Sequence, residues 1–144
     1  FNKNTDLLLY MAARSENIEA IKRTFNKKII LIDRFTDSTI AYQHFGMGAD
    51  LNLIKNLNKY LLKNIKVSFT FLNLVNKKNL KERLNQRKLL NRYDKFKISF
   101  YNKVQNGFLN LSRKQKNKYQ LINSNLDIDK NEKLILSKID RLIK

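Results

Sequence analysis

The sequence predicts an α/β domain in which a parallel sheet is flanked by helices. Two observations support this class. Extended apolar segments alternate with segments of helical periodicity along the chain, and that alternation is typical of a layered fold with parallel strands. The run Ile29-Ile30-Leu31-Ile32 is entirely aliphatic, as expected of a strand covered on both faces.

The apolar spacing places each element in turn. We expect helices at residues 6–25, 50–63, 77–90, 95–112 and 130–143, and strands at residues 28–32, 67–74 and 119–122. Asn4 or Thr5 is expected to cap the first helix, and Gly46 and Gly48 mark a loop. Ligands of such folds bind at the carboxyl ends of the strands, so the chemistry is expected there.

Composition limits the function classes. With 144 residues and 42% hydrophobic residues, the chain fits one domain with a real core. The sequence has no cysteine and one histidine, His44, which excludes disulfides, thiolate metal sites and histidine-rich metal sites. No apolar run approaches the length that spans a bilayer. The chain starts with Phe1 instead of methionine, so we expect it to be a fragment.

The charge leaves two interpretations open. The net charge is +18, a value that suggests nucleic-acid binding. Residues 1–50 are nearly neutral, with 7 Lys/Arg and 6 Asp/Glu, whereas residues 51–144 carry 23 and 6. The excess is mostly lysine mixed with asparagine and isoleucine, so it is either a solvated surface that has drifted in composition or a functional basic surface.

Asp33 and Arg34 directly follow the aliphatic run, at the expected ligand edge of the sheet. An arginine there can grip a phosphate with its two-pronged guanidinium, and an aspartate can orient it or hold a metal-bound water. An ion pair that closes the strand is the alternative. Further on, Ser38 could cap a short helix and share a face with Tyr42, where hydroxyls could contact a base or a sugar.

Arginines elsewhere offer two further signals. Arg14 falls in the apolar stripe of the first helix, one turn after Tyr10, so a ring and a guanidinium could bind a planar base together. A side chain that extends to water is the alternative. Arg83, Arg87 and Arg92 could close on a polyphosphate, although a solvated basic helix has the same pattern.

Together these segments resemble the thymidylate kinase family over essentially the whole chain. The resemblance rests on Leu7-Leu8-Leu9-Tyr10-Met11-Ala12-Ala13-Arg14, Asp33-Arg34-Phe35, Ser38-Thr39-Ile40-Ala41-Tyr42-Gln43, Gly46-Met47-Gly48, Asn91-Arg92-Tyr93-Asp94 and the residues from Phe100 to Phe108. It implies a P-loop-kinase-like sheet of five parallel strands, of which this chain would supply three and lack the first two, together with the phosphate loop. Residues 1–144 would then form one partial kinase domain with a lid at about 83–94.

The resemblance also implies an activity, the phosphorylation of dTMP by ATP with Mg²⁺. Tyr10 would stack on the thymine and Arg14 would contact it. Arg34 would hold the 5′-phosphate, and Asp33 would lie near the magnesium, bound through water. The remaining implied site residues are Ser38, Thr39, Tyr42 and Gln43 at the base and deoxyribose, and Arg83, Arg87 and Arg92 over ATP.

The full-length protein is expected to be a cytoplasmic homodimer that binds neither membrane nor nucleic acid, and the fragment alone is expected to be inactive. Asn73 departs from the family pattern, in which an aspartate is common at that position. Two alternatives remain: a related kinase with another base specificity, and a basic nucleic-acid-binding module.

Overall fold

The computed structural model describes residues 2–86, 88–89, 93 and 96–143. Their contacts divide the chain into two compact units. The first unit comprises Phe1–Val67 and Phe100–Leu111, and the second comprises Ser68–Ser99 and Ser112–Lys144.

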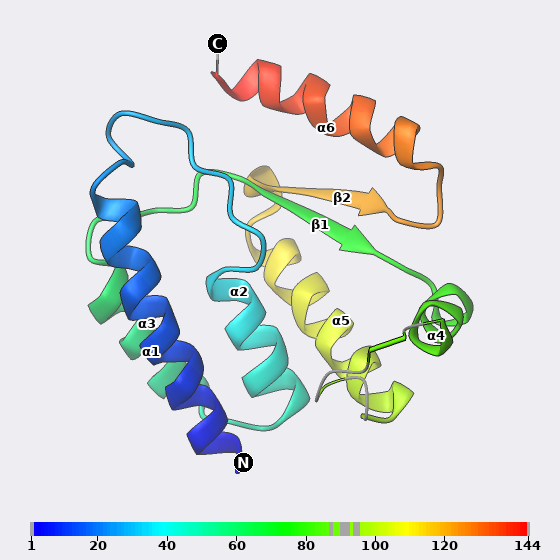
Figure 1. Cartoon of the computed structure of the whole chain (residues 1–144), viewed down its shortest axis with the longest axis horizontal. Coiled ribbons are helices and arrows are strands. Elements are labelled where there is room, and N and C mark those ends of the chain that lie inside the picture. The colour runs from blue at the N-terminus through cyan, green and yellow to red at the C-terminus, as the bar shows by residue number, and fades with distance from the viewer. Residues whose placement is uncertain (1, 87, 90–92, 94–95, 144) are drawn as a thin grey trace. The chain divides into compact units, whose positions relative to one another are not determined.

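The first unit is helical. It contains α1 (Lys3–Lys22), α2 (Thr36–Thr39), the π-helix η1 (Ile40–Gly46), α3 (Leu51–Leu62) and most of α5 (Ile98–Lys114) (Figure 1). Its core joins Leu7 and Met11 of α1 to Ala49 and to Ile54 of α3. The predicted helices are therefore present, with shifted ends.

Two capping predictions were wrong. The side chain of Asn2, rather than Asn4 or Thr5, caps α1 by accepting from the backbone amides of both of those residues. Ser38 lies inside α2, whose N-cap Phe35 makes no side-chain capping bond. A cap must precede its helix, and α2 begins at Thr36, three residues earlier than a Ser38 cap would require.

The segment after α2 winds as a π-helix, which is rare and often found at functional sites. Backbone bonds from Met47 to the Tyr42 carbonyl and from Gly48 to the His44 carbonyl close its end. Gly46 thus belongs to η1, and of the two expected loop glycines only Gly48 lies outside it. Gly48 has φ 75°, in the left-handed region that glycine adopts without strain.

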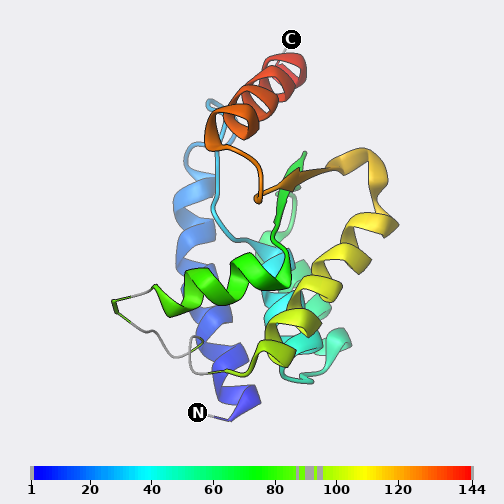
Figure 2. The same cartoon turned by 90° about the vertical axis from the view of Figure 1, so that its right-hand side faces the viewer.

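The second unit contains the sheet. Strands β1 (Thr70–Leu74) and β2 (Tyr119–Asn123) pair in parallel, with Leu72 opposite Leu121. Helix α4 (Lys77–Asn85) follows β1, the short 3₁₀ helix η3 (Lys116–Lys118) precedes β2, and α6 (Ile128–Ile143) follows it (Figure 2). Lys138 of α6 lies over the ring of Phe69, 4.8 Å from its centroid. The parallel pair confirms the predicted α/β class.

The predicted strand at residues 28–32 was wrong. Lys28 lies in a bend and residues 29–32 have no regular secondary structure, and Ile29 and Leu31 are 66% and 78% exposed instead of covered. A strand is held by its hydrogen-bonded neighbours, and within the described residues β1 and β2 pair only with each other. The described part of the chain therefore supplies two strands, not three.

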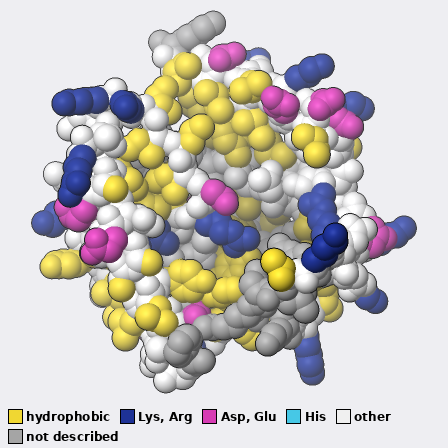
Figure 3. Space-filling model, viewed as in Figure 1, with side chains coloured by type: hydrophobic (Ala, Val, Ile, Leu, Met, Phe, Trp, Pro, Cys, Tyr) yellow, Lys and Arg dark blue, Asp and Glu magenta, His cyan; other side chains and the backbone are white. Residues whose placement is uncertain are grey.

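Exposed apolar side chains are common on the molecule (Figure 3). They include Leu8 and Leu9 of α1, Ile128 of α6, and Ile29, Leu31 and Ile32. None of the helices that the structure describes combines the length and the apolar character needed to cross a membrane.

Candidate functional site

Arg14 is buried in the first unit and bound to the segment that carries the predicted site. Its Nη2 donates to the Phe35 carbonyl at 2.9 Å and to the Thr39 hydroxyl at 2.8 Å, and its guanidinium lies over the Phe35 ring, 4.8 Å from the centroid. Burial lowers the pKa of Arg14, and the nearby Asp37 carboxylate opposes that shift. The side chain therefore does not extend to water, which was the alternative interpretation.

One nitrogen of the Arg14 guanidinium makes no hydrogen bond to the described residues. Its Nε is buried and has no hydrogen-bond partner in the described part of the chain. A buried donor without a partner is costly, and such a group in a native structure calls for an explanation.

Arg34 is the exposed counterpart of Arg14. Its guanidinium lies over the Tyr42 ring, 5.0 Å from the centroid, and its backbone has φ 60°. Although desolvation lowers the pKa of Arg34, the hydrogen bond and attraction to Tyr42, with smaller contributions from Asp33 and Tyr10, raise it above its ordinary value. The structure thus brings together four predicted site residues: Tyr10, Asp33, Arg34 and Tyr42.

Aromatic rings of α5 support Tyr42 from another side. The Phe100 and Phe108 rings meet Tyr42 edge-on, with centroids at 6.0 and 6.4 Å. A side chain at Gly107 would come within 2.7 Å of the Phe45 ring. The absence of that side chain lets α5 approach η1, and this approach places the two phenylalanines beside Tyr42.

Thr39 and Gln43 are committed to partners inside the protein. Thr39 is 2% exposed and its hydroxyl accepts from Arg14. Gln43 is 1% exposed, and its Nε2 donates to the buried carboxylate of Asp6 at 3.0 Å. Ser38 is half-buried in α2.

The predicted lid belongs to the second unit. Arg83, in the last turn of α4, is exposed and its Nη2 donates to the Ser124 carbonyl at 2.7 Å. Arg87 and Arg92 lie outside the described residues, as does much of the lid expected at 83–94.

Comparison with known proteins decides the family. The profile of the family described as "Thymidylate kinase" matches residues 1–135. The chain belongs to the thymidylate kinase family. This membership confirms the resemblance and favours it over a basic nucleic-acid-binding module.

Similarity to individual thymidylate kinases supports the same family. The chain is 32% identical to one from Wolbachia pipientis over 130 residues, which cover 89% of this chain and 62% of that protein. It is 33% identical over 135 residues to one from Geotalea daltonii, covering 88% and 63%. The crystal structure of thymidylate kinase from Ehrlichia chaffeensis superposes with a TM-score of 0.70 at 28% identity, covering 99% of this chain and 67% of that one.

These matches confirm the P-loop kinase fold, and the chain spans about three-fifths of the length of the curated relatives it matches. The presence of further strands and of a phosphate loop in the complete protein stays a prediction.

The carboxylates of the described residues limit how Mg²⁺ could bind. Among the described residues, His, Asp and Glu side chains form no cluster of three that could hold a metal. A kinase of this family needs none, because Mg²⁺ keeps several waters and binds through one or two carboxylates plus substrate phosphates. The exposed carboxylate of Asp33, beside Arg34, fits that mode.

Sequence reasoning missed two groups. Asp6 was not singled out, although it precedes Tyr10 by four residues as Tyr10 precedes Arg14; that polar spacing was a usable signal. The contacts of Phe100 and Phe108 with Tyr42 had no local signal, since 58 and 66 residues separate them from Tyr42 in the sequence.

Proposed function

We propose that the full-length protein transfers the γ-phosphoryl group of ATP to the 5′-phosphate of dTMP, giving dTDP and ADP. A phosphate oxygen of dTMP attacks the γ-phosphorus while its bond to the β,γ-bridging oxygen breaks. Such transfers depend on positioning and charge stabilisation rather than on covalent catalysis by the protein. The observation that carries the proposal is Arg34, an exposed guanidinium held over Tyr42 beside Tyr10 and Asp33.

Each side chain has a role in this proposal. Arg34 binds the 5′-phosphate with its two-pronged guanidinium. Tyr10 stacks on the thymine, and Arg14, held by its bonds to Phe35 and Thr39, contacts the base. The Tyr42 ring packs against the Arg34 guanidinium, and Tyr42 faces the deoxyribose. Thr39 and Gln43 act through Arg14 and Asp6, to which they are bonded.

Magnesium and the lid complete the proposed site. Asp33 would hold Mg²⁺ through water, and the ion would neutralise charge on the transferred phosphates. Arg83, Arg87 and Arg92 are proposed to contact ATP. The proposal extends to a homodimer in the cytoplasm that binds neither nucleic acid nor membrane; it follows from the family resemblance.

The test is to incubate the full-length protein with ATP, Mg²⁺ and each nucleoside monophosphate in turn, and to separate the products by chromatography. We expect dTDP, with kcat/KM for dTMP at least about tenfold above the next nucleotide. A preference for another monophosphate would instead assign a different base specificity. Failure to phosphorylate any of them would refute the proposal.

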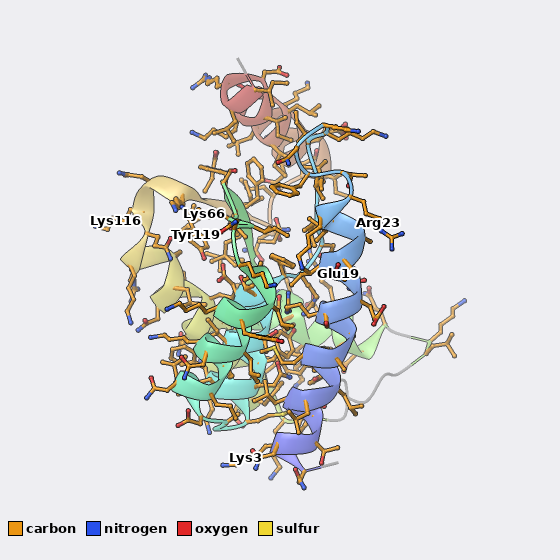
Figure 4. The ribbon with its side chains drawn as sticks, turned by 90° about the vertical axis from the view of Figure 1, so that its left-hand side faces the viewer. Lys3, Glu19, Arg23, Lys66, Lys116 and Tyr119 are labelled. Carbon is orange, nitrogen blue, oxygen red and sulfur yellow. The ribbon has the colours of Figure 1, made fainter. Side chains whose placement is uncertain are left out.

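A matched pair of variants tests the acceptor site. Arg34→Ala should raise KM for dTMP about a hundredfold, because the phosphate loses a charge-assisted bidentate partner. Arg23→Ala is the control: Arg23 follows α1, is exposed and points away from the helix (Figure 4). Unchanged dTMP saturation in Arg34→Ala would remove Arg34 from the site.

A further inference from the structure

From the buried pair Asp6–Gln43 we infer a positioning function: it fixes α1 against η1 and thereby sets the distance between Tyr10 and Tyr42. Asp6 is 3% exposed and Gln43 is 1% exposed, and 37 residues separate them. The inference rests on the proposed dTMP site, since Tyr10 and Tyr42 are its two sides.

Burial makes this pair costly to break. A carboxylate removed from water must be hydrogen-bonded, and the loss of one partner leaves the other unsatisfied in the interior. Gln43 Nε2 supplies a donor to Asp6 Oδ2 at 3.0 Å. Asp6 also lies in the first turn of α1, where the helix dipole favours negative charge. The pair is therefore a fixed point between the two helices.

The position of the pair connects it to the site. Asp6 precedes Tyr10 by one turn of α1, and Gln43 directly follows Tyr42 in η1. A displacement of Gln43 relative to Asp6 would shift Tyr42 relative to Tyr10, because helices move as rigid elements on this scale.

A second attachment lies on the other side of Tyr10. Arg14 bonds the Phe35 carbonyl and the Thr39 hydroxyl, eight residues and about 12 Å along α1 from Asp6. Segment 35–43 is thus attached to α1 at both ends, with Tyr10 between the attachments. Lys3, at the start of α1, adds an exposed bond to the Gly48 carbonyl at 2.9 Å (Figure 4).

A rotation of η1 about the Arg14 attachment alone would move Tyr42 most, since Tyr42 lies at the far end of the segment. The Asp6–Gln43 pair blocks that rotation. We therefore class Asp6 and Gln43 as positioning residues: they act on the nucleotide through Tyr42 and Tyr10. Their loss should affect dTMP and leave ATP unaffected.

The test uses kinetics on the full-length protein. Asp6→Ala should raise KM for dTMP about tenfold, with KM for ATP and kcat within about twofold of wild type. Asp6→Asn keeps an acceptor oxygen at the same reach and should restore KM for dTMP to within about twofold. Glu16→Ala removes an exposed carboxylate from the same helix and is the matched control. A parallel rise in both KM values, or none, would overturn the inference.

The pair itself is tested by a double-mutant cycle. Gln43→Met keeps the approximate shape of the side chain and removes the donor to Asp6. This variant also replaces Asp6→Ala in the kinetic test if Asp6→Ala does not fold. We expect the double variant Asp6→Ala/Gln43→Met to lose no more dTMP affinity than the worse single variant, because both remove one interaction. Additive losses would show that the residues act separately and would overturn the inference.

A spectroscopic measurement separates this inference from the proposed function. With 3-fluorotyrosine at position 42, the ¹⁹F signal should broaden or shift in Asp6→Ala and return in Asp6→Asn, without any nucleotide. A protein that fails to phosphorylate dTMP but shows this change would refute the function and keep the positioning pair. An unchanged signal in a protein that phosphorylates dTMP would refute the positioning pair and keep the proposed function.

Discussion

The guanidinium carbon of Arg34 lies 5.0 Å from the centroid of the Tyr42 ring, on a backbone whose φ is 60°. Left-handed φ is uncommon outside glycine, and for a residue with a Cβ it costs roughly 1–2 kcal/mol. Backbone strain of this kind clusters at functional sites, where surrounding contacts maintain it. The ring of Tyr42 is one such contact, so the strained backbone and the ring together aim the guanidinium.

A comparison of Arg34→Gly with Arg34→Ala should reveal that strain. Both variants lose the side chain, but only glycine adopts the left-handed region freely. Glycine also gives the unfolded chain more conformational entropy, which offsets part of this gain. We therefore expect the free energy of unfolding of Arg34→Gly to exceed that of Arg34→Ala by roughly 0.5–1 kcal/mol. Urea denaturation measures the difference. Equal stabilities would mean that position 34 is not strained in solution.

Gly107→Ala should destabilise the protein although alanine is the better helix former. Its Cβ would lie 2.7 Å from Cγ and Cδ2 of Phe45, so α5 or the ring must move. Overpacking of this kind costs about 1–3 kcal/mol, and it exceeds the roughly 1 kcal/mol gained in helix propensity. Thermal unfolding is the measurement.

The control for Gly107→Ala is Asn110→Ala, at an exposed position of the same helix. It should be neutral or slightly stabilising. The Gly107 variant should also raise KM for dTMP, since Phe100 and Phe108 of α5 contact Tyr42. A stabilised Gly107→Ala would contradict the close approach of α5 to η1.

Arg83 offers a test of the lid. One of its five N–H donors bonds the Ser124 carbonyl, so contact with ATP would use the remaining donors or replace that bond. Arg83→Ala should lower kcat by roughly ten- to a hundredfold, because a cation near the transferred group is lost, while KM for dTMP stays unchanged. Lys81→Ala, on the same helix, is the control, and steady-state kinetics at saturating dTMP is the measurement. Wild-type kcat in Arg83→Ala would leave Arg83 with the structural bond alone.

The sequence was sufficient for the parts that rest on local pattern. The apolar periodicity of α1, α3 and α6 predicted the bounds of each helix to within a few residues. The α/β class with parallel strands followed from the alternation of extended and helical segments. These features depend on spacing within one segment, which a sequence displays directly.

Other features depended on contacts between distant segments. A continuous aliphatic run at residues 29–32 has strand propensity, but a ladder also needs a neighbouring strand, and none of the described strands pairs with it. The roles of Thr39 and Gln43 likewise depended on what α1 presents to them. Their hydroxyl and amide suggested ligand contact, which stays a prediction; the bonds of these groups to Arg14 and Asp6 could not be foreseen. The π-helical winding of η1 left no signal that distinguished it from an α-helix.

The exposed aliphatic run supports a last prediction about self-association. Ile29 and Leu31 are 66% and 78% exposed in a segment without regular secondary structure. Such a segment is a template for pairing with another chain. We expect the 144-residue chain to form large assemblies at micromolar concentration, and Leu31→Lys to reduce them strongly, because a charge opposes stacking of the segment.

Leu53→Lys is the matched control, since Leu53 is an exposed leucine on helix α3 and carries the same change in charge. Light scattering and sedimentation velocity at equal concentrations would compare the three proteins. If residues 29–32 drive the association, Leu31→Lys lowers the scattering and Leu53→Lys leaves it near that of the unmodified chain. An equal decrease in both variants would attribute the effect to net charge, and the segment would then have no special part in it.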